Sequence, residues 1–383
     1  MELLRNYVCY VPTLRFKQFQ DNWSVKRLSD IAEVVGGGTP DTTDSTLWNG
    51  DIQWFTPTEV GHSKYVSTSI RTISQLGLQK SSAKILPAGS ILLSSRATVG
   101  ECSIAQKDCT TNQGFQSLIP KKSVNNEFIY YLAQTQKRHF IKYASGSTFL
   151  EISNSEIKKT KCAVPSIEEQ TEIATFLSAI DRKIEVQNKI ISKYETLIKG
   201  LRERVVNGGW QWKRLDELIQ EGVVRLNRGN IIPKHPKDNT YKYPVYSSST
   251  QNNGLMGYND TYMFDKELIT WSIDGGGNFF YRKKHKFNVT NVCGIMQVDE
   301  NVYSYRFIAE MLTYQHSKMK FDYQSKAHPS VISSLYSLPC LSISEQNFYC
   351  QLFIALDKKM YIEQYGLNKL KEQKKYLLSK MFI

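Results

Sequence analysis

The sequence lacks the cysteine and histidine spacings that hold disulfides or zinc. Its seven cysteines are odd in number and scattered, no CxxC pair occurs, and the six histidines form neither HxxxH nor HxH. Long apolar stretches are also missing, because the longest run, residues 128–133, falls far short of the roughly 20 residues that cross a bilayer. The N-terminus has no basic segment followed by an apolar one. We therefore expect a reduced, cytoplasmic chain without disulfides or structural zinc.

Known catalytic signatures are missing as well. The glycine runs at 36–38 and 275–277 lack the Lys-Ser/Thr that follows in a phosphate-binding loop. No two prolines are adjacent, so the Pro-Pro-aromatic motif of adenine methyltransferases is absent, and Pro40-Asp41 lacks the acidic-x-Lys of a nuclease. We therefore predict no catalytic residue and no metal site, and the alternative is an enzyme whose residues assemble from distant parts of the sequence.

The composition is that of a globular protein with a basic excess. The chain has 383 residues, of which 41% are hydrophobic and 22% charged, and this length leaves room for two or three domains. Its 49 Lys and Arg against 36 Asp and Glu give a formal net charge of +13. Such a surplus favours a polyanionic partner, most often nucleic acid. Charge alone does not decide, since many basic proteins bind nothing specific.

The chain repeats one plan twice. Residues 176–184 (FLSAIDRKI) return as 352–360 (LFIALDKKM) at an offset of 176, and the IEEQ that precedes the first segment returns as ISEQ. More loosely, residues 23–28 (WSVKRL) return as 210–215 (WQWKRL). Similarity is strong at the end of each half and weak inside it. This pattern predicts two divergent blocks, each followed by a closely copied element.

Each copied element carries apolar residues at a 4,3 spacing over more than four heptads, which is typical of a coiled coil. We predict long helices over 167–206 and 343–383, packed antiparallel so that Gln187 lies near Glu363. Two helices of separate bundles are the alternative. The predicted coiled-coil interface comprises Ile173, Leu177, Ile180, Ile184, Gln187, Ile191, Tyr194, Ile198, Leu201, Phe353, Leu356, Met360, Glu363, Leu367, Leu370 and Leu377.

The rest of the chain forms two predicted mixed α/β blocks, residues 1–166 and 207–342, with net charges of +6 and +4. Expected strands include 52–55, 90–93 and 268–271, and one short helix per block is expected, at 126–137 and 305–314. The predicted fold class is α+β: two α/β domains joined by two long helices packed as an antiparallel coiled coil, with a pseudo-twofold internal repeat.

The loops of both blocks are rich in Ser, Thr, Asn, Gln, Arg and Lys, the side chains that contact phosphates and the base edges of the major groove. Arg96 is the best candidate for a guanine contact, Gln113 or Asn253 for an adenine, and the lysines at 283, 284 and 286 suit phosphates. For each residue the alternative is an ordinary turn or surface position. The predicted DNA-binding residues are Thr39, Trp54, Ser94, Ser95, Arg96, Thr98, Asn112, Gln113, Lys142, Ser147, Thr148, Ser247, Ser248, Ser249, Gln251, Asn253, Tyr258, Trp271, Arg282, Lys283, Lys284, Lys286, Lys326 and His328.

The order of block, long helix, diverged block and long helix resembles the specificity (S) subunit of type I restriction–modification systems over essentially the whole chain. The opening residues 12–16 (PTLRF), with Trp23 and residues 26–28 (KRL), are similar to the start of such subunits. Residues 89–100 (GSILLSSRATVG) and 111–115 (TNQGF) resemble the pattern of their first block.

The helix openings carry the resemblance further. Glu169-Gln170 and Glu345-Gln346, each followed by an Ile/Leu-Asp-Arg/Lys-Lys run, are similar to the openings of the S-subunit helices, and residues 369–382 resemble their C-terminal end. The second block departs from the first, because WSIDG stands at 271–275 in place of the SSRAT run. This difference fits a domain that reads another DNA sequence.

The resemblance implies a non-catalytic DNA-recognition subunit. Each block would be a target recognition domain that reads one half of a bipartite site in the major groove of double-stranded DNA. The paired helices would set the unread spacer and hold the modification (M) and restriction (R) subunits of a phage-defence complex. S-adenosylmethionine, ATP and Mg would bind those partner subunits, and this chain would bind no cofactor. The alternatives are a coiled-coil scaffold with nonspecific DNA binding, or a DNA methyltransferase or nuclease with unrecognised motifs.

Overall fold

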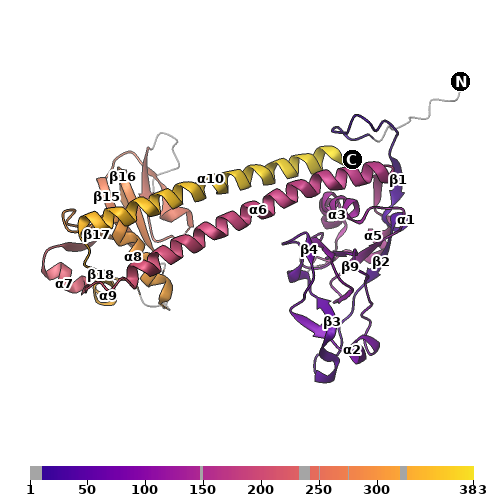
Figure 1. Cartoon of the computed structure of the whole chain (residues 1–383), viewed down its shortest axis with the longest axis horizontal. Helices are drawn as coiled ribbons and strands as arrows, with labels where there is room; N and C mark the ends of the chain where they lie inside the picture. Colours follow the sequence, from indigo (N-terminus) through magenta and orange to yellow (C-terminus); the bar gives the residue numbers. More distant parts are fainter. Residues whose placement is uncertain (1–10, 147–149, 233–241, 250, 275, 320–325) are drawn as a thin grey trace. The chain divides into compact units, whose positions relative to one another are not determined.

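A computed structural model describes residues 11–383 except 147–149, 233–241, 250, 275 and 320–325 (Figure 1). The chain divides into two compact units. Unit 1 comprises Met1–Asn188 with Tyr365–Ile383, and unit 2 comprises Lys189–Gln364. Each unit therefore contains one block together with parts of both long helices.

The helices are two long ones and several short ones. The long helices are α6 (Ile167–Val206) and α10 (Ile343–Met381). The short helices are α1 (Leu28–Ile31), α2 (Gln75–Gln79), α3 (Asn126–Thr135), α4 (Lys137–Tyr143), α5 (Asn154–Lys159), α7 (Leu215–Gln220), α8 (Tyr305–Lys318) and α9 (Pro329–Leu335), with 3-10 turns η1 (Ser45–Leu47), η2 (Pro57–Glu59) and η3 (Gln251–Gly254).

Unit 1 contains three small sheets built from the first block. A five-stranded sheet has the order β2-β9-β6-β7-β4, a three-stranded sheet the order β5-β3-β8, and β1 pairs with β10. The bounds are β1 (Ser24–Arg27), β2 (Ala32–Gly36), β3 (Trp48–Phe55), β4 (Tyr65–Val66), β5 (Arg71–Ile73), β6 (Ile91–Leu93), β7 (Cys102–Ala105), β8 (Cys109–Thr111), β9 (Gln116–Pro120) and β10 (Lys161–Val164).

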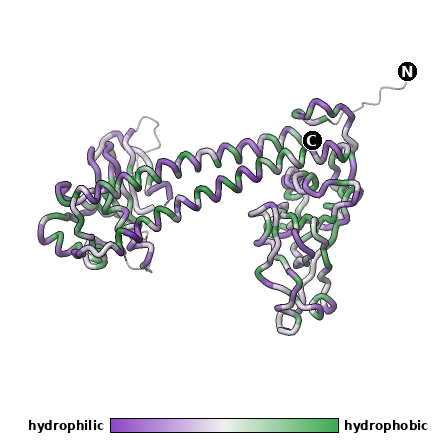
Figure 2. Tube along the Cα trace, viewed as in Figure 1, coloured by the Kyte–Doolittle hydropathy of each residue, from purple (hydrophilic) through white to green (hydrophobic). Residues whose placement is uncertain are grey.

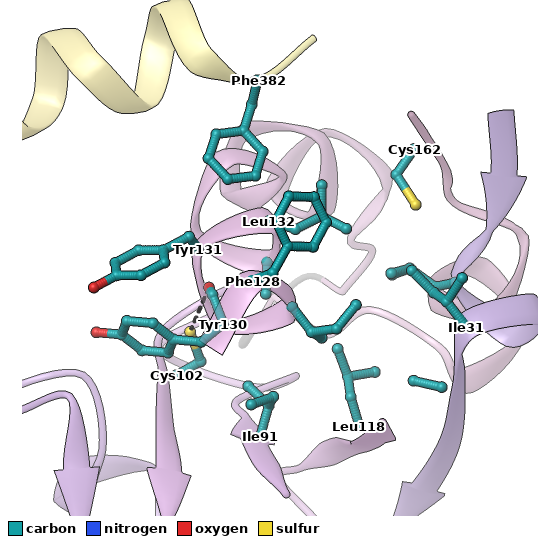
Figure 3. Close-up of a cluster of buried hydrophobic side chains, with 14 of the residues drawn as sticks. Ile31, Ile91, Cys102, Leu118, Phe128, Tyr130, Tyr131, Leu132, Cys162 and Phe382 are labelled. Carbon is teal, nitrogen blue, oxygen red and sulfur yellow. Dashed lines mark hydrogen bonds between the residues drawn. The ribbon is translucent and has the colours of Figure 1, made fainter. Parts of the chain in front are cut away.

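The core of unit 1 lies between its largest sheet, α3 and the ends of the long helices. All residues of β6 and β7 are buried, as expected of central strands covered on both faces. The six-residue apolar run 128–133 falls in α3 and is buried all round. Figure 3 shows Phe382, just beyond α10, against Phe128 of α3, where the ring centroids stack 5.3 Å apart.

Unit 2 contains one larger sheet of order β12-β17-β15-β16-β13-β14, and β11 pairs separately with β18. Trp271 of β15 fills its core and leaves room for nothing but a glycine at 294, since a Cβ there would lie 2.0 Å from the indole ring. The bounds are β11 (Trp212–Arg214), β12 (Val224–Arg228), β13 (Tyr243–Tyr246), β14 (Leu255–Asn259), β15 (Phe264–Ser272), β16 (Phe279–Val289), β17 (Cys293–Val298) and β18 (Ser337–Pro339).

The long helices and the one helix predicted in each block are confirmed, whereas the shorter helices were not predicted. The stripe predicted at 4,3 spacing is buried or half-buried at every position in α6 and α10, and Figure 2 shows the alternating hydropathy along both helices. The helices predicted at 126–137 and 305–314 are present as α3 and α8, but the described residues of each block also form shorter helices that were not predicted. Helices of four to seven residues are too short to display a 3.6-residue period.

The two long helices pack antiparallel, as predicted. In unit 1, Asp181 near the start of α6 forms an ion pair of 2.7 Å with Lys374 near the end of α10. In unit 2, Val205 at the end of α6 belongs to the same buried cluster as Phe353 near the start of α10. The proximity of Gln187 and Glu363 stays a prediction, because these two residues belong to different units.

The internal repeat is confirmed at the joint between each block and its long helix. The strand that carries the copied Trp and Lys-Arg pairs antiparallel with the strand that leads into the long helix, β1 with β10 and β11 with β18. The Leu28 N–H donates to the Thr160 carbonyl over 2.9 Å, and the Leu215 N–H donates to the Tyr336 carbonyl over 2.9 Å. The strand pairing and the backbone hydrogen bond next to it are thus the same in both halves.

A buried glutamine makes the same contacts in both joints. The side chains of Gln170 and Gln346 are 2% and 0% exposed. Their Oε1 atoms accept hydrogen bonds from the N–H of the residue that precedes a block helix, Asn125 before α3 (3.0 Å) and Ser304 before α8 (2.9 Å). Their Nε2 atoms donate to the backbone carbonyl five residues earlier, over 2.9 Å in both cases. Each glutamine therefore ties a long helix to its own block; we name this pair the joint glutamines.

Candidate nucleic-acid interface

Predicted DNA-binding residues of the first block come together on adjoining loops of unit 1. The Thr39 hydroxyl donates to the Gln113 side-chain oxygen. The Ser95 N–H donates to the Gly114 carbonyl over 2.8 Å, which places the loop with Arg96 beside the loop with Gln113. We name Thr39, Arg96, Thr98, Asn112 and Gln113 the unit 1 loop cluster.

Two members of this cluster are presented by a tight turn. Ala97 has a φ of 63°, a left-handed conformation that is costly for alanine and throws its neighbours Arg96 and Thr98 outward. Both neighbours are exposed. Arg96 forms an ion pair of 3.7 Å with Glu151, and both side chains are 45% exposed. An exposed pair of this kind contributes little to stability, so a ligand that displaces Glu151 from Arg96 costs the fold little.

Three predicted contact residues of the first block are interior residues instead. Trp54 is 4% exposed and its indole N–H donates to the Gly38 carbonyl over 2.8 Å. Ser94 and Ser95 are both fully buried. The prediction that these three side chains contact DNA directly is wrong, because they are buried. The polar loop motif that suggested the contact folds back under the exposed turn at Arg96. Lys142, in α4, is exposed, whereas Ser147 and Thr148 lie outside the described residues.

Unit 2 presents its predicted residues on a serine-rich turn and on the β14, β15 and β16 strands. Ser247 and Ser248 are half-buried and bonded to the segment after β16: the Thr290 hydroxyl donates to the Ser247 hydroxyl over 2.9 Å, and the Ser248 hydroxyl donates to the Val292 carbonyl. The predicted residues that are exposed here are Ser249, Gln251, Asn253, Tyr258, Lys283, Lys284 and Lys286. The Lys286 ammonium lies 4.6 Å from the Tyr262 ring centroid, which keeps its charge at the surface.

The remaining predictions in unit 2 divide between core and surface. Trp271 is fully buried and its indole N–H donates to the Ala327 carbonyl over 2.7 Å, so its predicted DNA contact is corrected as well. Lys326 and His328 flank that alanine and are exposed. The Lys326 ammonium lies 3.5 Å from the Asp274 carboxylate.

Arg282 differs from its basic neighbours because it is buried. Its side chain is 4% exposed. The guanidinium carbon lies 3.6 Å from the Tyr246 ring centroid and Nε donates to the Thr270 hydroxyl over 2.9 Å. Burial lowers the pKa of this guanidinium to about 10, which still leaves it charged at neutral pH. It borders a cavity of about 590 Å³ that Asn252, Asn253 and Lys283 also line.

Sequence reasoning missed two arrangements that depend on tertiary contacts. In unit 1, the Arg71 guanidinium lies 3.5 Å from the Trp48 ring centroid, and Trp48 meets Trp54 edge to face. In unit 2, Asn252 and Asn253 take left-handed φ values of 47° and 52°. The Asn-Asn-Gly string is a turn signal that sequence inspection can find, whereas no local signal places an arginine over a distant tryptophan.

Within the described part of the chain, no cluster of three His, Cys, Asp or Glu side chains is arranged to hold a metal ion. No described helix combines the length and the apolar character that crossing a membrane requires.

Comparison with known families matches most of the chain. The model of the type I restriction modification DNA specificity domain matches twice, over residues 20–196 and 207–335. One matched segment lies in each half of the internal repeat; the first includes most of α6, and the second ends before α10. The family assignment thus rests on both halves and not on one motif.

Curated relatives carry the same kind of name. The chain is 36% identical over 224 residues to the type I restriction enzyme MjaIX specificity subunit of Methanocaldococcus jannaschii, which covers 52% of each chain. It is 26% identical over 301 residues to the EcoprrI specificity subunit of Escherichia coli, covering 70% of this chain and 73% of the relative. The chain spans about half the length of the first curated relatives it matches.

Solved structures share the fold at low sequence identity. The S subunit of a type I restriction–modification system from M. genitalium superposes with a TM-score of 0.64 at 17% identity, covering 97% of this chain and 99% of that one. A chain from a structure that describes assembly and conformational transition of the type I system gives a TM-score of 0.57 at 14% identity, covering 94% and 97%. At these identities the likeness concerns the fold.

Proposed function

This chain belongs to the family of type I restriction modification DNA specificity domains, and we propose that it is the non-catalytic DNA-reading subunit of such a system. The observation that carries the proposal is the contrast within the repeat. The joint glutamines and their bonds recur in both halves, whereas the loops of the two blocks differ. A protein that holds two readers for two different half-sites needs this combination of constant attachment and variable surface.

The unit 1 loop cluster reads one half-site in this proposal. Arg96 is its guanine-contacting residue and Gln113 its adenine-contacting residue, because their side chains match the hydrogen-bonding edges of these bases in the major groove. Both side chains are exposed. Thr39, Thr98, Asn112 and Lys142 contact the adjacent sugar–phosphate backbone.

The second block reads the other half-site. Asn253 is the adenine-contacting residue, and Lys283, Lys284 and Lys286 contact phosphates. The corrected residues Trp54, Ser94, Ser95 and Trp271 support these loops from the interior. The target domains correspond to residues 1–166 and 207–342, and the helices over 167–206 and 343–383 set the unread spacer between the two half-sites.

The long helices also carry the partners in this proposal. In unit 2, α10 exposes Phe348, Ile354 and Tyr361, and in unit 1 it exposes Tyr365 and Tyr376. Exposed aromatic residues of this size are typical of protein-binding surfaces. We assign them to modification subunits that carry S-adenosylmethionine, with restriction subunits that use ATP and Mg joining the complex. A subunit that reads DNA in a phage-defence system acts in the cytoplasm, and we propose this compartment for the protein.

The test is a block exchange in the assembled complex. Residues 207–342 are replaced by the corresponding block of another specificity subunit, and methylated sites in the host genome are mapped by sequencing. We expect one half-site to change, while the other half-site and the spacer length stay the same, since both long helices are retained. A change in both half-sites overturns the division into two readers, and a changed spacer overturns the role of the helices. Exchange of residues 1–166 is the matched control and changes only the opposite half-site.

A further inference from the structure

The cavity beside Arg282 in unit 2 contains a buried cation without an anion. The guanidinium Nη2 is buried and has no hydrogen-bond partner among the described residues. The acidic residue that lines the same cavity is Glu310, and its carboxylate is already paired with Arg306 and, over 2.6 Å, with Arg202. A buried charge without a counter-ion is costly. Its retention therefore calls for a ligand that supplies the negative charge.

The other residues around the cavity favour an anion. Lys283 and His285 lie on its wall together with the side-chain amides of Asn252 and Asn253. The centroids of the Tyr246 and Phe280 rings lie 3.6 and 4.9 Å from the guanidinium carbon, so the edge and not the face is left for a ligand. A guanidinium edge matches the oxygen atoms of a phosphate in geometry and charge.

The burial of Arg282 indicates that its ligand is a DNA phosphate and not a base edge. Base edges lie at the floor of the DNA grooves and are read by side chains that protrude. Phosphate groups project from the duplex and can enter a hollow in the protein. Arg282 is 4% exposed and lies within such a hollow. We propose that this cavity seats one phosphodiester group of the DNA backbone, with Arg282 as its buried anchor; the proposal rests on the DNA-reading function above.

The turn over Arg282 has to shift for the phosphate to reach Nη2. A Cβ added to Gly254 would lie 3.3 Å from Nη2, so this glycine closely covers the guanidinium. Asn252, Asn253 and Gly254 have successive φ values of 47°, 52° and 78°. Asparagine and glycine enter the left-handed region more readily than other residues. A shift of η3 opens the seat.

The test is Arg282→Met, measured on the full chain in its assembled complex by DNA binding over a series of salt concentrations. Loss of one phosphate contact weakens binding by roughly 10- to 100-fold, and the slope of log K against log salt falls by about 0.9. Target and nontarget DNA are affected alike, because a phosphate carries no sequence information. Arg214→Met is the matched control, since Arg214 is exposed, pairs with Asp216 and does not line the cavity; its slope stays that of the wild type.

Duplexes that carry one uncharged methylphosphonate locate the contact. Neutralising one particular phosphate weakens the wild-type complex and leaves the Arg282→Met complex unaffected. If no position shows this dependence, or if the variant instead loses preference at a single base pair, the phosphate seat is overturned. If the wild-type complex binds all DNA with equal affinity, the DNA-reading function is wrong. The phosphate seat can still be tested in that case, because Arg282→Met lowers the salt slope on any DNA.

Thermal unfolding separates ligand binding from a structural role. Methionine is apolar and fills the space of the stem. Removal of a buried charge without a counter-ion offsets the lost bond from Nε to the Thr270 hydroxyl, so the melting temperature changes little. A lower melting temperature together with an unchanged salt slope shows that Arg282 only supports the fold, and that outcome rejects the proposal.

Discussion

The joints of the two units solve the same attachment problem with partly different side chains. Asp181 of α6 and Asp357 of α10 occupy equivalent positions of the repeat. In unit 1, Asp181 accepts a hydrogen bond of 2.6 Å from the Tyr131 hydroxyl. In unit 2, Asp357 pairs with Arg306 over 2.6 Å. The aspartate recurs while its partner on the block helix changes from a phenol to a guanidinium.

The neighbouring acid shows the same divergence. In unit 1, Glu127 bonds to Lys64 over 3.0 Å, and burial lowers the pKa of that lysine. In unit 2, Glu310 is 6% exposed in its side chain and is held between Arg202 and Arg306. Contacts that reach the backbone, such as those of the joint glutamines, are repeated. Contacts between side chains are not repeated: the aspartate is retained while its partner changes. A retained acid needs a partner in each unit, because a buried charge left unpaired is costly.

The start of each long helix provides a third contrast. Glu169 is 2% exposed and forms two hydrogen bonds of 2.7 Å with Arg15, which comes from the N-terminal segment of the first block. Its equivalent Glu345 is exposed and forms a capping box with Ser342. The same residue type therefore anchors a distant segment in unit 1 and only caps a helix in unit 2.

Removing the joint glutamines has the largest expected effect. Gln346→Leu leaves three backbone groups without their partner, the Ser304 N–H and the carbonyls of Val302 and Leu341. At roughly 1–3 kcal/mol for each unpaired buried group, we expect the unfolding free energy to fall by about 3–9 kcal/mol in denaturant unfolding.

Gln170→Leu removes two such bonds and is expected to cost less, about 2–6 kcal/mol. Hydrogen exchange assigns each loss to its unit, with α8 deprotected in the first variant and α3 in the second. Gln351→Leu, on the exposed side of α10, is the control. Equal and small losses in all three variants contradict the role of the glutamines as ties.

The second-largest expected effect is loss of the ion pair between Arg15 and Glu169, which has no equivalent at Glu345 among the described residues of unit 2. Glu169→Ala leaves Arg15, whose side chain is 11% exposed, without its carboxylate, and we expect a loss of about 3 kcal/mol in unfolding free energy. Glu345→Ala removes an exposed cap and costs clearly less. Limited proteolysis provides the structural readout, since release of residues 11–23 exposes them to cleavage in the first variant only. Cleavage at similar rates in both variants removes the contrast between the two helix starts.

The sequence predicted the elements whose signal is periodic or repeated. The 4,3 stripe identified α6 and α10 together with their antiparallel packing, and the offset of 176 identified the joints. The sequence did not allow us to predict which individual polar loop residues are buried. Ser94 and Ser95 share a motif with Arg96, yet only the left-handed turn at Ala97 decides that the arginine points outward and the serines inward. The burial of Arg282 without a counter-ion depends on Tyr246 and Gly254, which come from another part of the sequence. No local sequence pattern predicts such a contact.

The smallest expected effect concerns the two equivalent aspartates. Asp181→Asn leaves the Lys374 ammonium, whose side chain is 19% exposed, without its ion pair, and we expect the unfolding free energy to fall by about 1–2 kcal/mol. Asp357→Asn costs less, because Asp357 is 41% exposed and Arg306 keeps Glu310 as a second partner. Lys374→Met added to each variant completes the comparison: it couples to Asp181→Asn in a double-mutant cycle and adds independently to Asp357→Asn. Coupling of equal size in both cycles means that the two joints do not differ in the way their contacts indicate.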